Sequence, residues 1–351
     1  MDALPVLSVR DLGVGFATRS GFLTALDGVG LTIARGEILG LVGESGAGKS
    51  LVGAAIAGLV PPPGRVVGGT ISLSGTRIDD LDEAGWRRVR GRRIGTIFQD
   101  PMTSLNPLMR VGDQLVETIR AHLPLSRAQA RSRAVELLAE VGIPAPERRI
   151  DGYPHEFSGG MRQRVVIALA LAAEPELIIA DEPTTALDVS VQAQIIALIE
   201  RLCRERRTAV LLITHDMGVI ARAAHRVAVM YAGRVVETGT ASDLVRRPLH
   251  PYARGLMGAI PPLGERPRRL VQVPGTMPRL AAIPSGCAFH PRCGAAMPVC
   301  PRAVPNLRQV GGREVSGQDI GGQDIGGQDI GDRDVACHLY VDEAMPRTAV
   351  A

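Results

Sequence analysis

Short continuous apolar runs, separated by longer segments of mixed polarity, organise the first two thirds of the chain. Runs of this kind are typical of strands buried on both faces of a parallel sheet. Three runs predict such strands, with helices between them: residues 38–42, 177–181 and 209–214. Three other runs predict an antiparallel part: residues 7–16, 29–33 and 70–78. The pattern therefore predicts an α/β fold.

The middle of the chain has a different pattern, with polar residues between regularly spaced apolar ones. Apolar residues recur at helical spacing at Val135, Leu138 and Val141. Residues 100–174 are therefore expected to be largely helical and to form an arm on the α/β core.

A hairpin is expected to close the first domain. Residues 227–231 and 234–237 are strand-like and are joined across Ala232-Gly233. Beyond the hairpin, prolines and arginines replace the periodic pattern. We therefore expect two domains, residues 1–245 and 246–351.

Composition excludes several classes of protein. With 45% hydrophobic and 22% charged residues, the 351-residue chain is neither wholly disordered nor collagen-like. No apolar run reaches the roughly 18 residues of a membrane-spanning helix. Residues 1–10 show no basic start followed by an apolar segment, so no secretory signal is expected and the cytoplasm is the expected location. The net charge of +4 is too small and too scattered to indicate a nucleic-acid partner.

A glycine-rich segment after the run at residues 38–42 fits the phosphate-loop pattern G-x-x-x-x-G-K-[ST] in full. Such glycines let backbone N–H groups turn toward phosphate oxygens, at the positive end of the helix expected over residues 51–59. A turn without a ligand is the alternative, but strand, loop, lysine and helix follow in the required order. The residues expected to bind the triphosphate are Gly43, Glu44, Ser45, Gly46, Ala47, Gly48, Lys49, Ser50 and Leu51.

Lysine usage supports the same conclusion. Lys49 is the only lysine in the chain, and the other 39 basic residues are arginines. A compact ammonium enters a tight phosphate loop as a point charge, whereas a planar guanidinium does not fit in the same way. Lys49 is therefore expected to reach the β- and γ-phosphates, and the Ser50 hydroxyl is expected to ligate Mg²⁺.

Two adjacent carboxylates follow another predicted strand. Asp181 and Glu182 end the run at residues 177–181, so they are expected at the sheet edge beside the phosphates. Asp181 would hold the Mg²⁺ shell, and Glu182 would act as general base toward the attacking water. Two adjacent acidic residues at a strand end are often only a solvated turn. Their combination with the phosphate loop is what favours a catalytic role.

A Ser-Gly-Gly turn before an apolar helical run lies between these motifs, in the segment Phe157-Ser158-Gly159-Gly160-Met161-Arg162-Gln163-Arg164. With it, the chain resembles the ATP-binding subunit of an ATP-binding-cassette (ABC) transporter. The resemblance implies a phosphate-loop NTPase core with an antiparallel β part and a helical subdomain. It also implies that Ser158, Gly159 and Gly160 form a second anion site, which closes on the γ-phosphate bound by the opposite subunit. Met161, where the general signature has Gln, is similar to the peptide-importer branch.

The same resemblance assigns two further residues around Glu182. Gln99, after the apolar run at residues 94–98, is similar to the residue that senses Mg²⁺ and water and contacts the membrane subunits. His215, after the strand expected at residues 209–214, is similar to the switch histidine that contacts the γ-phosphate and orients Glu182. A lone histidine is more often structural, so the position after a strand carries this assignment.

Two assignments concern the edges of the site. Asp188 resembles the residue of the loop that communicates across the dimer. Phe16 is the candidate for stacking on adenine, with Phe22 as the rival and a core role as the alternative for either.

Four of the five cysteines fall near the C-terminus. Cys287, Cys293, Cys300 and Cys337 follow the spacing C-x5-C-x6-C-x36-C. Four thiolates in a reducing cytoplasm favour a metal over disulfides. Cys203, inside a helical pattern, is expected to be an inert buried thiol.

The surroundings of these cysteines resemble the C-terminal extension of oligopeptide and dipeptide importer ATPases, in residues 250–256 and 286–293. In that family the extension can hold a four-iron four-sulfur cluster. Zn²⁺ is the physical rival, with His290 or His338 able to replace one thiolate. Four unliganded thiols are the third alternative.

A five-residue repeat precedes the last cysteine. Residues 316–335 read as copies of Gly-Gly-Gln-Asp-Ile with small changes. We expect a flexible loop there. Doubling a loop costs only about 0.6 kcal/mol, so the insertion does not prevent Cys337 from joining the other cysteines.

The resemblance implies an ATPase that energises uptake of peptides across the cytoplasmic membrane, from its cytoplasmic face. The expected partners are two transmembrane permease subunits, a second ATPase subunit and, indirectly, an extracytoplasmic solute-binding protein. Import of another small solute such as nickel is the alternative. A soluble ABC ATPase acting on nucleic acid or ribosomes is a competing class, but such proteins usually carry two cassettes or a long coiled coil. A kinase leaves the Ser158-Gly159-Gly160 turn unexplained.

Overall fold

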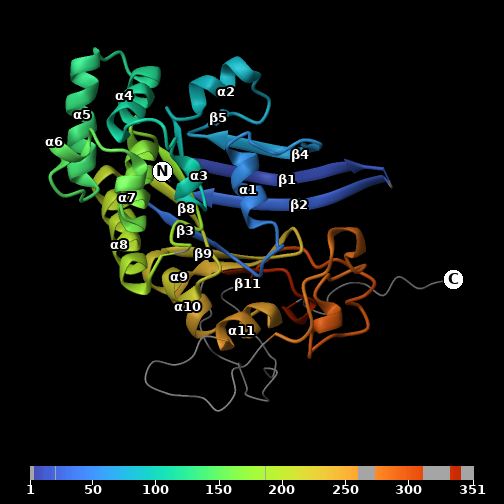
Figure 1. Ribbon diagram of the computed structural model, residues 1–351. Coiled ribbons are helices and arrows are strands. Elements are labelled where there is room, and N and C mark those ends of the chain that lie inside the picture. Colours follow the sequence, from blue (N-terminus) through green and yellow to red (C-terminus); the bar gives the residue numbers. More distant parts are fainter. Residues whose placement is uncertain (1–3, 20, 186, 260–272, 311–332, 341–351) are drawn as a thin grey trace.

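An antiparallel sheet forms one layer of the molecule (Figure 1). The computed structural model describes residues 4–19, 21–185, 187–259, 273–310 and 333–340. The sheet has the order β2-β1-β4-β5, with strands β1 (Leu7–Thr18), β2 (Gly21–Ile33), β4 (Gly64–Leu73) and β5 (Thr76–Arg77). It confirms the predicted antiparallel part. The run at 70–78 is two strands rather than one, because the chain turns at Ser74 and Gly75, which have φ of 45° and 81°.

The second sheet carries the strands whose ends form the site. Its order is β11-β12-β10-β9-β3-β8-β7-β6, in which β11 is Arg308–Val310 and β12 is Arg333–Val335. Strands β6, β7, β8, β3 and β9 are parallel, and β10 returns antiparallel to β9 as the predicted hairpin. Their bounds are β3 (Ile38–Val42), β6 (Ile94–Ile97), β7 (Leu177–Asp181), β8 (Ala209–Ile213), β9 (Arg226–Tyr231) and β10 (Arg234–Thr240).

Every residue of β3 and β8 is buried, as expected for strands covered on both faces. Helices of the α/β core follow or precede these strands: α1 (Lys49–Ile56), α2 (Glu83–Val89), α8 (Val189–Arg206) and α9 (Met217–Ala223). Because β3, β6, β7 and β8 are parallel, their carboxyl ends share one edge of the sheet, and the loops that leave them meet there. The α/β fold with mixed sheets is thereby confirmed.

The helical arm stands at one end of the molecule, at the upper left of Figure 1. It contains α3 (Pro101–Ser104), α4 (Val111–His122), α5 (Arg127–Glu140), α6 (Pro146–Arg149), the 3-10 turn η1 (Pro154–Glu156) and α7 (Gly159–Leu171). Leu138 and Val141 are fully buried in its core, as their spacing predicts. Val135 is only half-buried, because α5 turns Ala134 and Leu137 toward the core instead.

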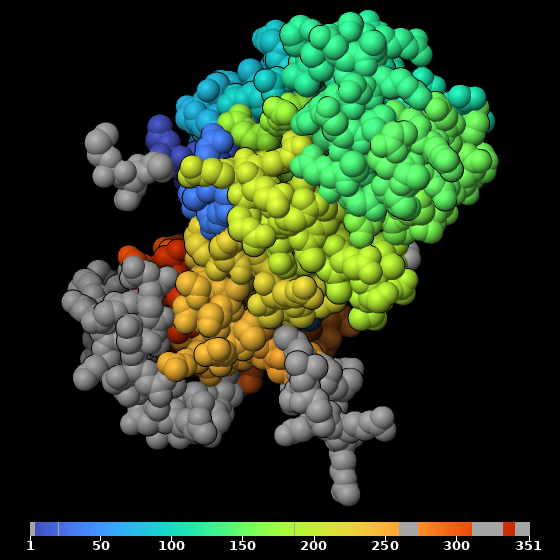
Figure 2. Space-filling model, turned by 90° about the vertical axis from the view of Figure 1, so that its left-hand side faces the viewer, coloured from blue at the N-terminus to red at the C-terminus, as the bar shows by residue number. Residues whose placement is uncertain are grey.

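The C-terminal extension packs at the opposite end from the arm. Figure 2 shows its orange and red atoms against the lower part of the yellow core, with the green arm at the upper right. Helix α10 (Ala241–Arg246) leads into the extension. The elements of the extension are α11 (Pro251–Gly258), β11 (Arg308–Val310), β12 (Arg333–Val335) and the 3-10 turns η2 (Leu280–Ala282), η3 (His290–Arg292) and η4 (His338–Tyr340).

Strand β12 joins this extension to the main sheet. It pairs with β10, with Glu237 opposite Val335, and also with β11. One sheet therefore contains strands from both sides of residue 246, where the sequence predicts a domain boundary. The prediction of a loop through residue 335 is wrong for residues 333–335, which form β12 because β10 offers them a free edge. Residues 316–332 of the repeat lie outside the described residues.

A buried carboxylate stabilises the junction between β10 and the extension, which we call the seam. Glu237 of β10 has no exposed surface, and it accepts hydrogen bonds from the backbone N–H groups of Leu249 (2.9 Å) and His250 (2.8 Å). Arg333 of β12 lies 4.0 Å from it. Burial raises the pKa of Glu237 although these donors and Arg333 act in the opposite direction. The extension is thus attached through the core rather than at the surface.

Candidate nucleotide site

The phosphate loop follows β3 and leads into α1, as predicted. Gly43, Gly46 and Gly48 have φ of 153°, 84° and 104°, in the region that favours glycine. A Cβ at Gly43 would lie 2.3 Å from the carbonyl oxygen of Met230, so the backbone approach itself requires glycine. These glycines therefore fix the curvature that lets N–H groups face an anion.

Lys49 begins α1 and points back into this loop. Its ammonium donates to the carbonyls of Gly43 (2.8 Å) and Glu44 (3.1 Å), and the residue is only 6% exposed. Burial lowers the pKa of Lys49, partly offset by the carboxylates of Glu182 and Asp181. The single lysine of the chain is therefore held at the centre of the loop.

The two predicted Mg²⁺ ligands lie in contact. Ser50 donates a hydrogen bond of 3.0 Å to Asp181 at the end of β7. Burial raises the pKa of Asp181, and the hydrogen bond from Ser50 partly offsets this. A hydroxyl and a carboxylate at this spacing fit a hard divalent cation that keeps water ligands.

Glu182 is the centre of a hydrogen-bonded group built from three loops. Its carboxylate accepts from Gln99 Nε2 (3.1 Å) and Thr185 Oγ1 (3.0 Å) and contacts His215 Nδ1 (2.9 Å). Burial raises its pKa, but the hydrogen bonds from His215 and Thr185 outweigh burial and lower the net pKa. Glu182 is therefore an ionised proton acceptor at neutral pH.

The backbone of Glu182 is strained. It has φ of 46°, a conformation that costs a non-glycine residue energy and that is concentrated at functional sites. Its N–H is held by the carbonyl of Ile213 at 2.8 Å, at the end of β8. The neighbouring strand therefore fixes the turn that presents the carboxylate.

The Ser-Gly-Gly turn begins helix α7, as predicted, but it does not lie beside the phosphate loop of its own chain. Ser158 caps α7 by accepting from the Met161 N–H (3.3 Å), and a Cβ at Gly160 would lie 2.6 Å from Val191. Asp188 caps α8 by accepting from the Val191 N–H (2.9 Å), so the two loops are neighbours. In Figure 1, α7 stands with the arm and apart from α1. The turn is thus separated from the phosphate loop of its own chain.

The aromatic candidates for adenine lie on opposite arms of the β1–β2 hairpin. Phe16 of β1 is half-buried and contacts Gly64, and Phe22 of β2 is 47% exposed. The Arg65 guanidinium lies 5.9 Å from the ring centre of Phe22. The adenine assignment remains a prediction.

Three contributing residues were missed by sequence reasoning. Thr185 donates to Glu182, and Tyr252 and Arg292 contact Glu44 of the phosphate loop. Thr185 lies close enough along the chain to have been suspected from its position three residues after Glu182. The other two come from the extension, 208 and 248 residues away, and no local pattern indicates them.

The four C-terminal cysteines gather around one pocket. Cys287, Cys293, Cys300 and Cys337 line it together with residues of η3 and η4. Burial raises the pKa of Cys287 and Cys293, and that of Cys337 to about 12. Within the described ranges, however, no three or more His, Cys, Asp or Glu residues form a group that could hold a metal ion, so the expected cluster is not supported.

Cys203 behaves as predicted. It is 2% exposed, and its Sγ donates to the Thr208 carbonyl at 3.1 Å. Burial raises its pKa to about 11, which keeps it a protonated thiol.

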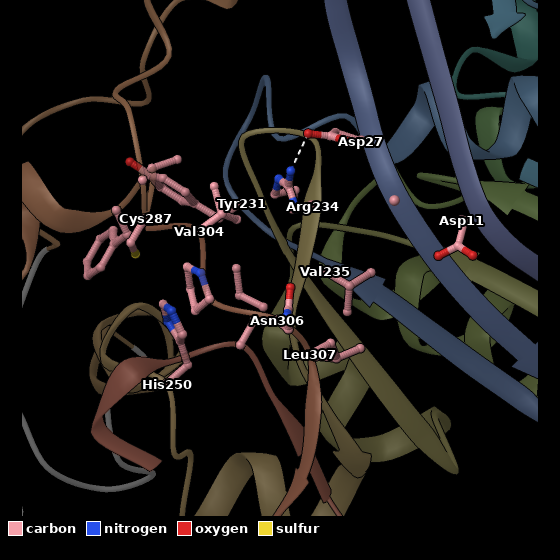
Figure 3. Close-up of a pocket in the computed structure, with 17 residues that line it drawn as sticks. Asp11, Asp27, Tyr231, Arg234, Val235, His250, Cys287, Val304, Asn306 and Leu307 are labelled. Atoms are coloured by element: carbon pink, nitrogen blue, oxygen red, sulfur yellow. Dashed lines mark hydrogen bonds and ion pairs between the residues drawn. The ribbon is translucent and has the colours of Figure 1, made fainter. Parts of the chain in front are cut away.

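A larger cavity, of about 290 Å³, lies at the seam between the β9–β10 hairpin and the extension. Figure 3 shows His250 and Cys287 along one side and Val235 and Leu307 along another, with Arg234 turned to Asp27. His250 and Cys287 also line the cysteine pocket, so the two hollows adjoin. This cavity is separate from the phosphate loop residues described above.

Comparisons with known proteins agree with this geometry. The family described as "ABC transporter" matches residues 26–185, and the family described as "Oligopeptide/dipeptide transporter, C-terminal region" matches residues 236–300. The chain is 49% identical over 300 residues to the oligopeptide transport ATP-binding protein OppD of Salmonella typhimurium, covering 86% of this chain and 89% of that protein. It is 48% identical to the dipeptide transport ATP-binding protein DppD of Bacillus subtilis, covering 86% and 90%.

Solved structures agree as well. The dimeric ATP-binding cassette MJ0796 bound to ADP and Pi matches with a TM-score of 0.60 and 30% identity, covering 67% of this chain and 98% of that chain. None of the described helices has the length and apolar character needed to cross a membrane. The chain therefore belongs to the ABC transporter family, among the ATP-binding subunits that carry the oligopeptide/dipeptide transporter C-terminal region.

Proposed function

We propose that this chain hydrolyses ATP to energise the import of oligopeptides or dipeptides across the cytoplasmic membrane. The relatives are named as oligopeptide and dipeptide transport ATP-binding proteins, and the C-terminal match is to the same class of transporter. The observation that carries the proposal is the Glu182 carboxylate, held by Gln99, Thr185 and His215 beside the contacting Ser50–Asp181 pair.

The chain's residues divide the work of hydrolysis. Lys49 and the N–H groups of the phosphate loop hold the β- and γ-phosphates. Ser50 and Asp181 would hold Mg²⁺, which would neutralise charge on the phosphates. Ionised Glu182 accepts a proton from the attacking water, while Gln99 and His215 fix the direction of its carboxylate.

A second nucleotide domain completes the pocket. Ser158, Gly159 and Gly160 lie apart from the phosphate loop of their own chain, which supports their use against the nucleotide of a partner. Asp188 sits beside this turn and would communicate across the interface. Closure of the two domains on ATP is the step that does mechanical work.

Membrane subunits convert closure into transport. Gln99 is exposed at the end of β6, next to the arm, where two permease subunits would dock. The chain would then act as a peripheral subunit at the cytoplasmic face, and an extracytoplasmic solute-binding protein would deliver the peptide. Residues 1–245 would form the nucleotide domain and residues 246–351 the extension.

The finer part of the proposal concerns the cysteine pocket. Four thiols around one hollow have the donor chemistry for a four-iron four-sulfur cluster, or for Zn²⁺. Among the residues that the structure describes, the thiols do not form a group that could hold a metal ion. Anaerobic purification followed by iron, sulfide and zinc assays decides: stoichiometric zinc without sulfide removes the cluster, and neither metal leaves four free thiols.

Reconstitution tests the function as a whole. The chain is co-purified with its membrane subunits and placed in liposomes with MgATP. We expect ATP hydrolysis that rises when a peptide-loaded binding protein is added, and none with Glu182→Gln. Recovery of RNA or DNA in place of membrane subunits would contradict the proposal.

A further inference from the structure

The C-terminal extension reaches the phosphate loop directly. Arg292 of η3 makes a two-pronged ion pair with the Glu44 carboxylate, at 2.8 and 2.9 Å. The Tyr252 hydroxyl of α11 accepts the backbone N–H of Glu44 at 2.7 Å. Met277 lies beside Gly46, 3.8 Å from where a Cβ would stand. Three separate segments of the extension therefore meet one turn of the loop.

Contacts other than the one with Glu44 hold the Arg292 side chain in place. Its side chain is 8% exposed, and its Nε donates to the carbonyl of Pro274 at 2.6 Å. Its guanidinium lies 5.7 Å from the ring centre of Tyr231 and 5.8 Å from that of Phe289. A guanidinium held by carbonyls and aromatic rings loses little freedom when it binds a carboxylate, so the pair is pre-organised.

Glu44 places a carboxylate in the loop that is proposed to bind a triphosphate. Its carboxylate adds negative charge next to the site of an anionic ligand, and like charges at this range repel. Arg292 neutralises that charge from behind the loop. The Glu44 N–H is donated to Tyr252, and the Glu44 carbonyl accepts from Lys49, so backbone and side chain are both fixed.

We propose that Arg292 is a positioning residue that neutralises and orients Glu44, so that the C-terminal extension sets the affinity of the phosphate loop for nucleoside triphosphate. The inference rests on the proposed nucleotide binding by this loop and adds a second requirement to it. Arg292 lies on the turn between Cys287 and Cys293, with the His290 N–H held by the Cys287 carbonyl at 2.9 Å. The extension thus contacts the loop through its cysteine-bearing segment.

The decisive test is whether a second substitution, at Glu44, restores the affinity that is lost when Arg292 is removed. Binding of a fluorescent N-methylanthraniloyl ATP and steady-state hydrolysis are measured on the full-length chain. Arg292→Ala is expected to weaken binding about tenfold and to raise KM with little change in kcat, because a hydrogen-bonded charge partner is lost. Adding Glu44→Gln to Arg292→Ala is expected to recover most of the affinity, since the uncompensated charge is then gone.

Controls separate this effect from damage to the fold. Arg302→Ala removes an exposed arginine of the same extension and should bind ATP like the wild type. Arg292→Lys should lie between wild type and Arg292→Ala, because one ammonium cannot make both bonds. If Arg292→Ala does not fold, Arg292→Gln replaces it in the same comparison.

The outcomes are distinct. Unchanged affinity in Arg292→Ala, or a double variant no better than the single one, overturns the inference while leaving nucleotide binding intact. A wild-type chain that binds no nucleotide in the presence of Mg²⁺ overturns the proposed function itself.

Discussion

Two glutamates of this chain each accept several hydrogen bonds, yet their environments shift their pKa values in opposite directions. Glu182, at the sheet edge, is contacted by side chains of Gln99, Thr185 and His215, and its pKa is lowered. Glu237, inside the seam, is held by backbone N–H groups, and its pKa is raised. Burial raises the pKa of both, but only Glu182 keeps enough water for its donors to prevail.

The difference shows how one residue type serves two purposes. Side-chain donors on separate loops can rearrange when a ligand enters, so Glu182 suits a group that must accept and release a proton. Backbone donors cannot leave, so Glu237 suits a permanent joint between the cassette and its extension. Substitutions should therefore affect rate at one glutamate and stability at the other.

The largest expected effect is on turnover. Glu182→Gln keeps the shape of the side chain and removes its capacity as a base, so kcat should fall by about 10²- to 10⁴-fold. ATP affinity and Tm should stay close to wild type, because the residue is neither in the phosphate loop nor in the core. Phosphate release and nucleotide binding measure the two quantities, and hydrolysis at the normal rate would refute the role of Glu182.

The corresponding change at the seam should act on folding. Glu237→Ala removes the carboxylate that lies 4.0 Å from the buried Arg333 and leaves two N–H groups without an acceptor, so the free energy of unfolding should drop by about 3–5 kcal/mol. Glu237→Gln, which retains one acceptor oxygen, is the matched control and should lose less. Urea denaturation followed by circular dichroism measures both, and equal stability of all three chains would show that the seam does not depend on this carboxylate.

A smaller effect is expected on the pH dependence of hydrolysis when Thr185 is replaced. Thr185→Ala removes a donor that lowers the pKa of Glu182, so that pKa should rise. The ionised fraction at a given acidic pH then falls, and the acid limb of the rate profile should move to higher pH. Hydrolysis measured across an acidic pH series tests this; an unmoved limb would mean that Thr185 does not act on the base.

The smallest effect comes from the equivalent bond at the seam. Thr238 Oγ1 donates to Asp334 at 3.0 Å, so each site contains a threonine–carboxylate pair. Thr238→Val should lower the free energy of unfolding by about 1 kcal/mol and leave the pH profile of hydrolysis unchanged. A shifted pH profile in this variant would break the division between the two sites.

The sequence predicted the parts of the site that depend on neighbours along the chain. The phosphate loop, the Asp181–Glu182 pair and the Ser158 cap are each defined within a few residues, because glycine conformations, strand ends and helix caps are local. The two strands β3 and β7 were predicted with correct ends, since both are buried runs bounded by polar residues.

Other parts could not be read from local patterns. The three-residue strand β12 lies within a repeat of polar and small residues, and only its pairing with β10 makes it a strand. The contact of Arg292 with Glu44 joins residues 248 apart, and neither residue is distinguished from other charged residues of the chain. Such interactions depend on how completed elements pack, which periodicity and composition do not encode.

The pairing of β11 with β12 has a consequence for how this protein can change over time. Arg308 lies opposite Val335, so the ladder sets the position of Cys337 from both flanks of the tandem array. The number of pentapeptide copies between the two strands is then not constrained by the geometry of the cysteines. As long as β11 and β12 stay paired, a change in the number of copies is therefore expected to leave Cys337 in register.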